Sequence, residues 1–208
     1  MKVIRPFGPT VGKVTIPNQI INELNDYVDN IIDDENKSKI LDHGKMLAGN
    51  VKQEFLLEKE FMVFSGWENF LKENTEKWIM ESVQKKNSKF EIQNSWIVRQ
   101  FENEYNPLHM HSAHISGVGY LKIPEDFGET SQSNKKDNYN GKLQLVHGSQ
   151  MFLSPVTLDI TPKVGEFYFF PNYLMHCVYP FKNTKAERRS VSFNALIDNQ
   201  IYNNWPDG

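Results

Sequence analysis

The chain has 208 residues, of which 39% are hydrophobic and 24% are charged, and its formal net charge is −3. These values are typical of a globular protein of one domain and exclude an intrinsically disordered chain. Lysine and arginine are scattered among acidic residues, so the sequence lacks the basic stripe of a nucleic-acid-binding protein, and its apolar runs are too short to cross a membrane.

The chain has one cysteine, Cys177, and therefore cannot form an intrachain disulfide, which favours a reducing compartment. Its first residues contain no apolar stretch of the kind that a signal peptide needs. We therefore expect a soluble cytoplasmic protein that binds neither nucleic acid nor a membrane. The sequence leaves the oligomeric state open, and a homodimer is one alternative.

The first half of the chain predicts two helices. Residues 2–16 alternate and end at Pro17, which indicates an opening strand or an extended arm. From residue 18 to about residue 34, apolar residues recur at steps of three and four and form one stripe along a helix. Residues 35–53 are polar and contain glycine, so we expect a long loop there. A second helical pattern covers residues 67–85.

From Phe90 onward the pattern changes to short strands separated by turns. Helices followed by a run of strands predict an α+β fold, mainly β, in which helices pack on one face of a β-sandwich or barrel. Residues 125–141 are polar and rich in turn formers, and we interpret them as a surface excursion that could act as a lid. The predicted strands are residues 95–102, 115–123, 142–146, 166–170, 176–181 and 188–197.

Three of the six histidines point to a metal site. His109 and His111 stand two positions apart, and residues i and i+2 of a strand point the same way, so both can bind one ion. His176 precedes an apolar strand and is the best candidate for a third ligand. Neutral imidazoles suit Fe(II), Zn(II) or Cu(II), and three on one face leave the opposite face open. We expect His114 and His147 to be structural or peripheral.

The strand 188–197 contains a candidate site for a carboxylate. Arg188 and Ser190 share one face of this strand, and an arginine with a hydroxyl two residues on can grip a carboxylate in bidentate fashion. Arg189 belongs to the other face, and we expect it to lie outside the barrel. We interpret Trp96 and Tyr120 as core aromatics, although an inward tyrosine could donate a hydrogen bond to the same carboxylate.

Three segments together resemble the 2-oxoglutarate- and iron(II)-dependent oxygenases: NPLHMHSAHISGVGYLKIP, GEFYFFPNYLMHCVYP and ERRSVSFN. They are similar to a prolyl-hydroxylase-related subgroup of marine bacteria and their phages, over about residues 94–196. The resemblance implies a bacterial or phage-encoded protein with one oxygenase domain over residues 1–208. Residues 1–88 would be a helical support region, and residues 89–200 would form a double-stranded β-helix, the jelly-roll or cupin-like fold.

By position, the resemblance implies that His109, His111 and His176 bind Fe(II) and that Arg188 and Ser190 hold the distal carboxylate of 2-oxoglutarate. The implied activity is a dioxygenase reaction that consumes O2 and 2-oxoglutarate and hydroxylates an unactivated C–H bond. The substrate would be a residue of a peptide or protein, or a small metabolite.

The sequence departs from the wider superfamily at the second ligand, which is usually a carboxylate and here is His111. A register that begins at His111, with Ser112 and Ala113, would resemble the iron halogenases, in which a halide takes the vacant position. Two other classes remain open: a three-histidine cupin-like metalloprotein without 2-oxoglutarate, and a non-enzymatic jelly-roll binding module.

Overall fold

A computed structural model describes residues 8–130, 132, 134–182 and 184–203. Five α-helices and one short 3-10 helix lie among these residues: α1 (Asn18–Asp33), α2 (Glu35–Leu41), η1 (Gly44–Met46), α3 (Lys59–Phe64), α4 (Trp67–Val83) and α5 (Asn199–Tyr202). Within the same residues the strands are β1 (Gly12–Thr15), β2 (Gln53–Leu56), β3 (Phe90–Gln100), β4 (Asn106–His109), β5 (Ile115–Lys122), β6 (Leu143–Val146), β7 (Thr157–Ile160), β8 (Glu166–Pro171), β9 (Met175–Val178) and β10 (Arg188–Ile197).

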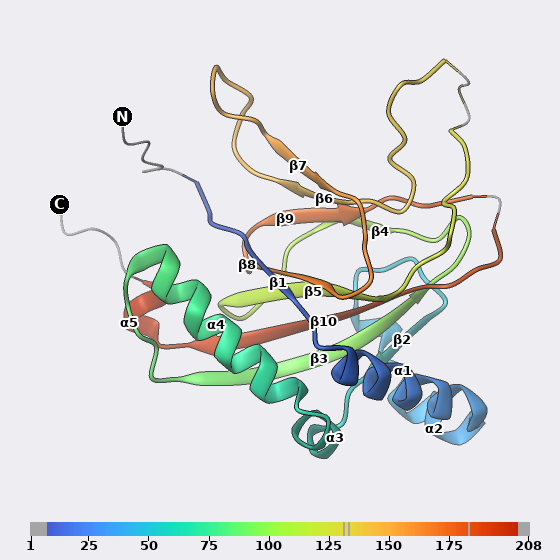
Figure 1. The fold of residues 1–208 in the computed structure, drawn as a ribbon, viewed down its shortest axis with the longest axis horizontal. Coiled ribbons are helices and arrows are strands. Elements are labelled where there is room, and N and C mark those ends of the chain that lie inside the picture. The colour runs from blue at the N-terminus through green and yellow to red at the C-terminus, as the bar shows by residue number, and fades with distance from the viewer. Residues whose placement is uncertain (1–7, 131, 133, 183, 204–208) are drawn as a thin grey trace.

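The described strands form two antiparallel sheets that face each other, with helices on the outer side of the larger one (Figure 1). The larger sheet has the order β1-β8-β5-β10-β3-β2, and the smaller has the order β4-β9-β6-β7. This is the predicted fold class, a mainly β α+β protein built as a double-stranded β-helix. In the described part of the chain, no helix is both long and apolar enough to span a bilayer.

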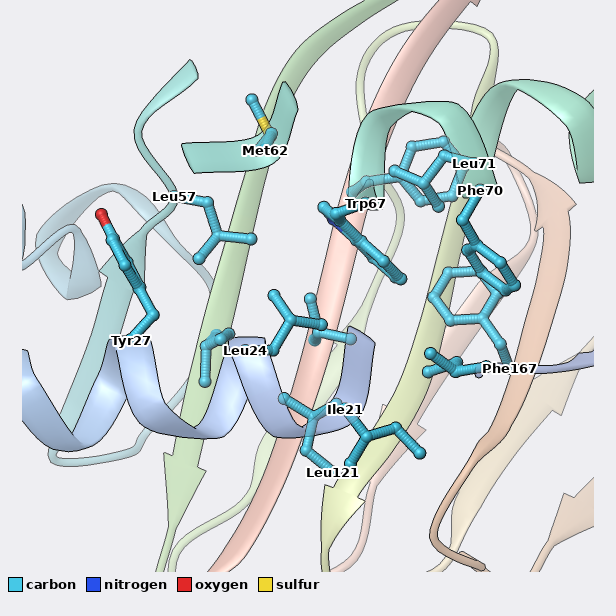
Figure 2. Close-up of a cluster of buried hydrophobic side chains, with 14 of the residues drawn as sticks. Ile21, Leu24, Tyr27, Leu57, Met62, Trp67, Phe70, Leu71, Leu121 and Phe167 are labelled. Atoms are coloured by element: carbon cyan, nitrogen blue, oxygen red, sulfur yellow. The ribbon is translucent and has the colours of Figure 1, made fainter. Parts of the chain in front are cut away.

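Apolar side chains fill two layers, one on each face of the larger sheet. The outer layer joins α1, α3 and α4 to the sheet, and Figure 2 shows side chains of all three helices in one cluster with Phe167 and Leu121 of the strands. The inner layer lies between the two sheets and contains Val118, Leu145 and Phe170. Because alternate residues of a strand point to opposite faces, each central strand contributes to both layers.

Two glycines of β5 make room for aromatic rings on the helical side. A Cβ atom on Gly117 would lie 2.7 Å from ring atoms of Phe167 and Phe193, and one on Gly119 would lie 2.4 Å from the Phe167 ring. The rings of Phe167 and Phe193 lie 6.0 Å apart and tie β8 to β10 over these glycines. The glycines therefore let β5 sit in the middle of the sheet beneath bulky neighbours.

The N-terminal half contains more structure than its sequence predicted. The predicted helices are α1 and α4, but the expectation of a long loop over residues 35–53 is wrong, since α2 and η1 lie there. Asp34 caps α2 by accepting hydrogen bonds from the backbone N–H groups of Asn36 and Lys37. Leu41 is the buried residue of α2, so this helix has no apolar stripe that a periodicity search could find.

The strands were mostly placed correctly. Strand β10 has its predicted bounds, whereas β3 begins at Phe90, five residues earlier than expected. Strands β2, β4 and β7 were missed because each has only four residues, too few for a recognisable apolar alternation. Among the described residues of 125–141, neither helix nor strand is found, as expected of a surface excursion.

Replacing Gly119 by alanine is expected to destabilise the protein by about 1–3 kcal/mol, because the added methyl group collides with Phe167 and Ile16 in a packed layer. Urea unfolding of Gly119→Ala beside Lys122→Ala, an exposed position on the same strand, measures this. Equal free energies of unfolding for the two variants would show that the outer apolar layer accommodates the added methyl group without loss of stability.

Candidate metal centre

The structure brings together the three histidines that the sequence analysis selects. His109 ends β4, His176 lies opposite it on β9, and His111 follows β4 by two residues. One side-chain nitrogen of each ring lies within 4.8 Å of the others, and these three residues form the one such group of possible metal ligands in the described chain. The side chains come from one end of the smaller sheet and face the larger sheet.

Backbone hydrogen bonds hold His111 in place although it lies beyond the end of β4. Its N–H group donates to the carbonyl of Asn172 over 3.0 Å, and its carbonyl accepts from the Asn172 side chain over 3.2 Å. Met110 between the two histidines is exposed, as strand alternation predicts. The spacing of two residues therefore brings both rings to the inner side.

Carbonyl groups fix the tautomers of two of the histidines. Nδ1 of His109 lies 2.7 Å from the carbonyl of Pro107, and Nδ1 of His176 lies 2.8 Å from the carbonyl of Leu174. A carbonyl oxygen can only accept a hydrogen bond, so each Nδ1 carries the proton and each Nε2 has a free lone pair. Orientation of a ligating imidazole by its second nitrogen is the usual arrangement at metal sites.

The cluster is neutral at physiological pH. Burial and the neighbouring His176 and His109 lower the pKa of His111 to about 3. Burial and His109 lower the pKa of His176 to about 4, and burial also lowers the pKa of His109. Neutral imidazoles are the form that binds metal ions.

The geometry of the cluster fits a transition-metal ion. Nε2 of His111 and Nε2 of His176 lie 3.1 Å apart. Adjacent nitrogens on one ion, each bound at about 2.1 Å, lie about 3 Å apart. Two lone pairs at this distance repel each other unless a proton or a cation lies between them. The three residues could therefore hold a metal ion with little rearrangement.

The three histidines line a pocket that also contains a buried arginine, Arg188. The walls of this pocket also include Ser190. Arg188 is 1% exposed, and its Nη1 donates to Oε1 of Gln100 over 3.1 Å. Nε and Nη2 of Arg188 are also buried, and they find no hydrogen-bond partner among the described residues. Burial lowers the pKa of Arg188, but a guanidinium stays protonated in proteins.

The adjacent Arg189 is a buried arginine whose N–H groups all have partners within the protein. It lies on the outer face, as expected, but it is only 1% exposed beneath α1. Its Nε donates to Glu187 over 2.7 Å and its Nη2 donates to Asp29 over 2.7 Å. Arg188 has no such ion pair among the described residues. The pocket therefore fits an anion that would supply two acceptor oxygens to the unpaired N–H groups.

Tyr120 and Trp96 are buried, as expected of core aromatics, and each lies next to a residue of the pocket. Trp96 is part of the pocket wall, and its ring lies 5.6 Å from that of His111. Tyr120 lies beneath Arg188, with 5.1 Å from the guanidinium carbon to the ring centre. Its hydroxyl is buried without a partner among the described residues, and burial raises its pKa to about 12, so it remains a hydrogen-bond donor.

The remaining histidines of interest lie outside the cluster. His114 stacks on Tyr202 with ring centres 4.0 Å apart, and its Nδ1 accepts from the N–H group of Ile197. His147 is exposed. Gln100 was not singled out from the sequence, because a glutamine at the end of a strand carries no signal of its own.

Residues 94–194 match the protein family described as "Putative 2OG-Fe(II) oxygenase", where 2OG denotes 2-oxoglutarate. No curated protein matches the chain in sequence.

Solved structures resemble most of the chain at low sequence identity. A prolyl-4-hydroxylase of Pseudomonas putida has a TM-score of 0.57 at 14% identity, with 88% of this chain and 91% of that chain covered. A viral collagen prolyl hydroxylase of Paramecium bursaria Chlorella virus-1 has a TM-score of 0.53 at 15% identity, with 89% and 94% covered. The 2-oxoglutarate-dependent epimerase SnoN of nogalamycin biosynthesis has a TM-score of 0.59 at 14% identity, with 88% and 76% covered. At these identities the likeness establishes the fold.

The metal-free protein is expected to lose stability as the pH falls below about 6.5. In the unfolded chain each histidine takes up a proton near its ordinary pKa of 6.5, whereas His176 and His111 stay neutral in the folded state down to about 4 and about 3. Between these values the unfolded state binds more protons, so acidification favours unfolding by up to about 1.4 kcal/mol per pH unit for each proton.

Urea unfolding between pH 5 and pH 8 in the presence of a chelator measures this dependence. The variant His111→Asn/His176→Asn should show a shallower slope than the wild type, whereas His147→Asn, at an exposed position, should not. Parallel slopes for all three proteins would show that the cluster does not exclude protons.

Proposed function

We propose that this chain, whose residues 94–194 match the 2OG-Fe(II) oxygenase family, is a dioxygenase that hydroxylates an unactivated C–H bond. Fe(II) and 2-oxoglutarate are the metal and the co-substrate of that family. One observation carries the proposal. A cluster of three neutral histidines and a buried arginine with unpaired N–H groups line the same pocket.

His109, His111 and His176 would hold the iron. Their free nitrogens converge, and the carbonyls of Pro107 and Leu174 keep two of the rings in the ligating tautomer. Because His109 belongs to the cluster, the set is complete without Ala113, and this favours the three-histidine site over a halide-binding one. Three neutral ligands leave the full charge of the ion inside the pocket, in contrast to sites with a carboxylate ligand.

Arg188 and Ser190 would hold the distal carboxylate of 2-oxoglutarate. Nε and Nη2 of Arg188 supply two donors of the fork that binds a carboxylate, and the Ser190 hydroxyl lies 3.5 Å from Nη1. The Tyr120 hydroxyl is a further donor that we assign to this end of the pocket. All three residues belong to the inner faces of the adjacent strands β5 and β10.

The family chemistry couples the conversion of 2-oxoglutarate and O2 into succinate and CO2 to the insertion of the second oxygen atom into a substrate C–H bond. The chain's own residues would hold the keto acid and keep water away. The apolar side chains of Trp96, Val118, Leu143 and Phe170 form part of the pocket wall and would limit the access of water.

The substrate that we propose is a residue of a peptide or protein, or a small metabolite. Support for a peptide is limited to the fold, which the chain shares with two prolyl hydroxylases. The same fold carries a different reaction in the epimerase SnoN, and fold alone therefore does not select the substrate.

Replacing Arg188 by methionine is expected to weaken 2-oxoglutarate binding by at least about 100-fold, because a charge-assisted bidentate contact is lost in a buried site. Anaerobic titration of the Fe(II)-loaded protein with 2-oxoglutarate measures this through the visible charge-transfer band of the keto-acid chelate. Replacing His176 by alanine should abolish both the band and the formation of succinate.

Lys163→Ala, which removes an exposed cation, is the control for loss of charge and should behave as the wild type. Iron binding without the band in the wild type would favour a cupin-like metalloprotein. Failure of the wild type to retain iron would favour a binding module.

A further inference from the structure

Among the described residues, Arg188 donates hydrogen bonds to the side chains of Gln100 and Ser190. Gln100 ends β3, lies opposite Arg188 in the register of β3 with β10, and is 0% exposed. Its Oε1 accepts from Nη1 of Arg188 over 3.1 Å. The contact leaves Nε and Nη2 of the arginine for a ligand.

The amide of Gln100 can take one orientation only. Its Nε2 donates to the carbonyl of Glu104 over 2.6 Å and to the carbonyl of Tyr179 over 3.3 Å. A flipped amide would place Oε1 against two carbonyl oxygens and its N–H groups against a guanidinium, and neither side could then form a hydrogen bond. The acceptor oxygen is therefore held toward Arg188.

The two carbonyls connect Gln100 to both strands that carry histidines of the cluster. Glu104 lies in the turn that leads from β3 into β4, whose last residue is His109. Tyr179 directly follows β9, which carries His176. The Gln100 side chain thus contacts Arg188 of β10, the residue that follows β9, and the turn that leads into β4.

We propose that Gln100 is a positioning residue for the co-substrate, which orients Arg188 toward the carboxylate of 2-oxoglutarate and fixes its distance from the histidines. This inference rests on the function proposed above. Because the spacing between arginine and metal sets the length of diacid that fits, Gln100 also determines the selectivity for a five-carbon keto acid over a six-carbon one.

The neutrality of Gln100 is as important as its shape. A glutamate has the same length, but its negative charge would lie beside Arg188. It would neutralise the positive charge of the guanidinium, which the co-substrate carboxylate would otherwise pair with. The glutamate would also oppose carboxylate oxygens to the carbonyls of Glu104 and Tyr179. Glutamine offers two donors on one side and one uncharged acceptor on the other, and this site uses all three.

Two variants with one matched control test the proposal. Gln100→Glu adds the charge, Gln100→Met keeps the volume and neutrality but removes the hydrogen bonds, and Gln93→Glu makes the same charge change at an exposed position of β3. Three quantities are measured for each: the affinity for Mn(II) alone, the anaerobic affinity of the Fe(II)-loaded protein for 2-oxoglutarate, and the ratio of kcat/KM for 2-oxoadipate to that for 2-oxoglutarate.

Gln100→Glu is expected to weaken 2-oxoglutarate binding by about 100-fold and Gln100→Met by about tenfold. Mn(II) affinity should stay within about threefold of the wild type, and Gln100→Met should shift the 2-oxoadipate ratio by at least about threefold. Gln93→Glu should change none of the three quantities.

Wild-type affinities for 2-oxoglutarate in both Gln100 variants would overturn the inference. So would an equal loss of Mn(II) and 2-oxoglutarate binding, because that pattern indicates general damage to the fold. If the wild type binds Mn(II) but not 2-oxoglutarate, the proposed function itself fails, and the inference fails with it.

Discussion

The buried guanidinium of Arg188 is the constraint around which the inner half of this protein is arranged. Strand β10 lies in the middle of the larger sheet and is buried on both faces, so its inward arginine cannot reach bulk water. Removing such a charge from water costs several kcal/mol unless an opposite charge or hydrogen bonds compensate for it. The described residues compensate Arg188 in part, through Gln100, Ser190 and the ring of Tyr120. An anion in the pocket would supply what is missing.

The site is divided between the two sheets. The histidines belong to β4, β9 and the segment after β4, whereas Arg188 and Ser190 belong to β10 of the larger sheet. Helices α1 and α4 cover the outer face of the larger sheet, and the network of Arg189, Glu187 and Asp29 fastens α1 to β10 next to Arg188. A ligand that contacts both histidines and arginine would therefore span the two sheets, and the helices hold one side of that span rigid.

The sequence predicted what alternation and spacing encode. The pairs His109/His111 and Arg188/Ser190 each stand two positions apart, and a strand places such residues on one side, so their inward direction followed from the sequence. The contact of Gln100 with Arg188 could not be predicted, because it depends on the register between β3 and β10 and on two backbone carbonyls. Helix α2 was missed because a capping aspartate, and no apolar stripe, determines where it begins.

Charge explains why so many neutral groups surround one cation. The three imidazoles are uncharged, and Gln100, Ser190 and Tyr120 contribute dipoles but no charge to the pocket. A divalent ion on the histidines would place two positive charges at one end of the pocket, and Arg188 places one at the other. A dianion with a carboxylate at each end matches this distribution better than a monoanion, because each end meets an opposite charge in a medium that screens poorly. A carboxylate in place of His111 or Gln100 would weaken that attraction at one end, and so the neutrality of both residues serves the same purpose.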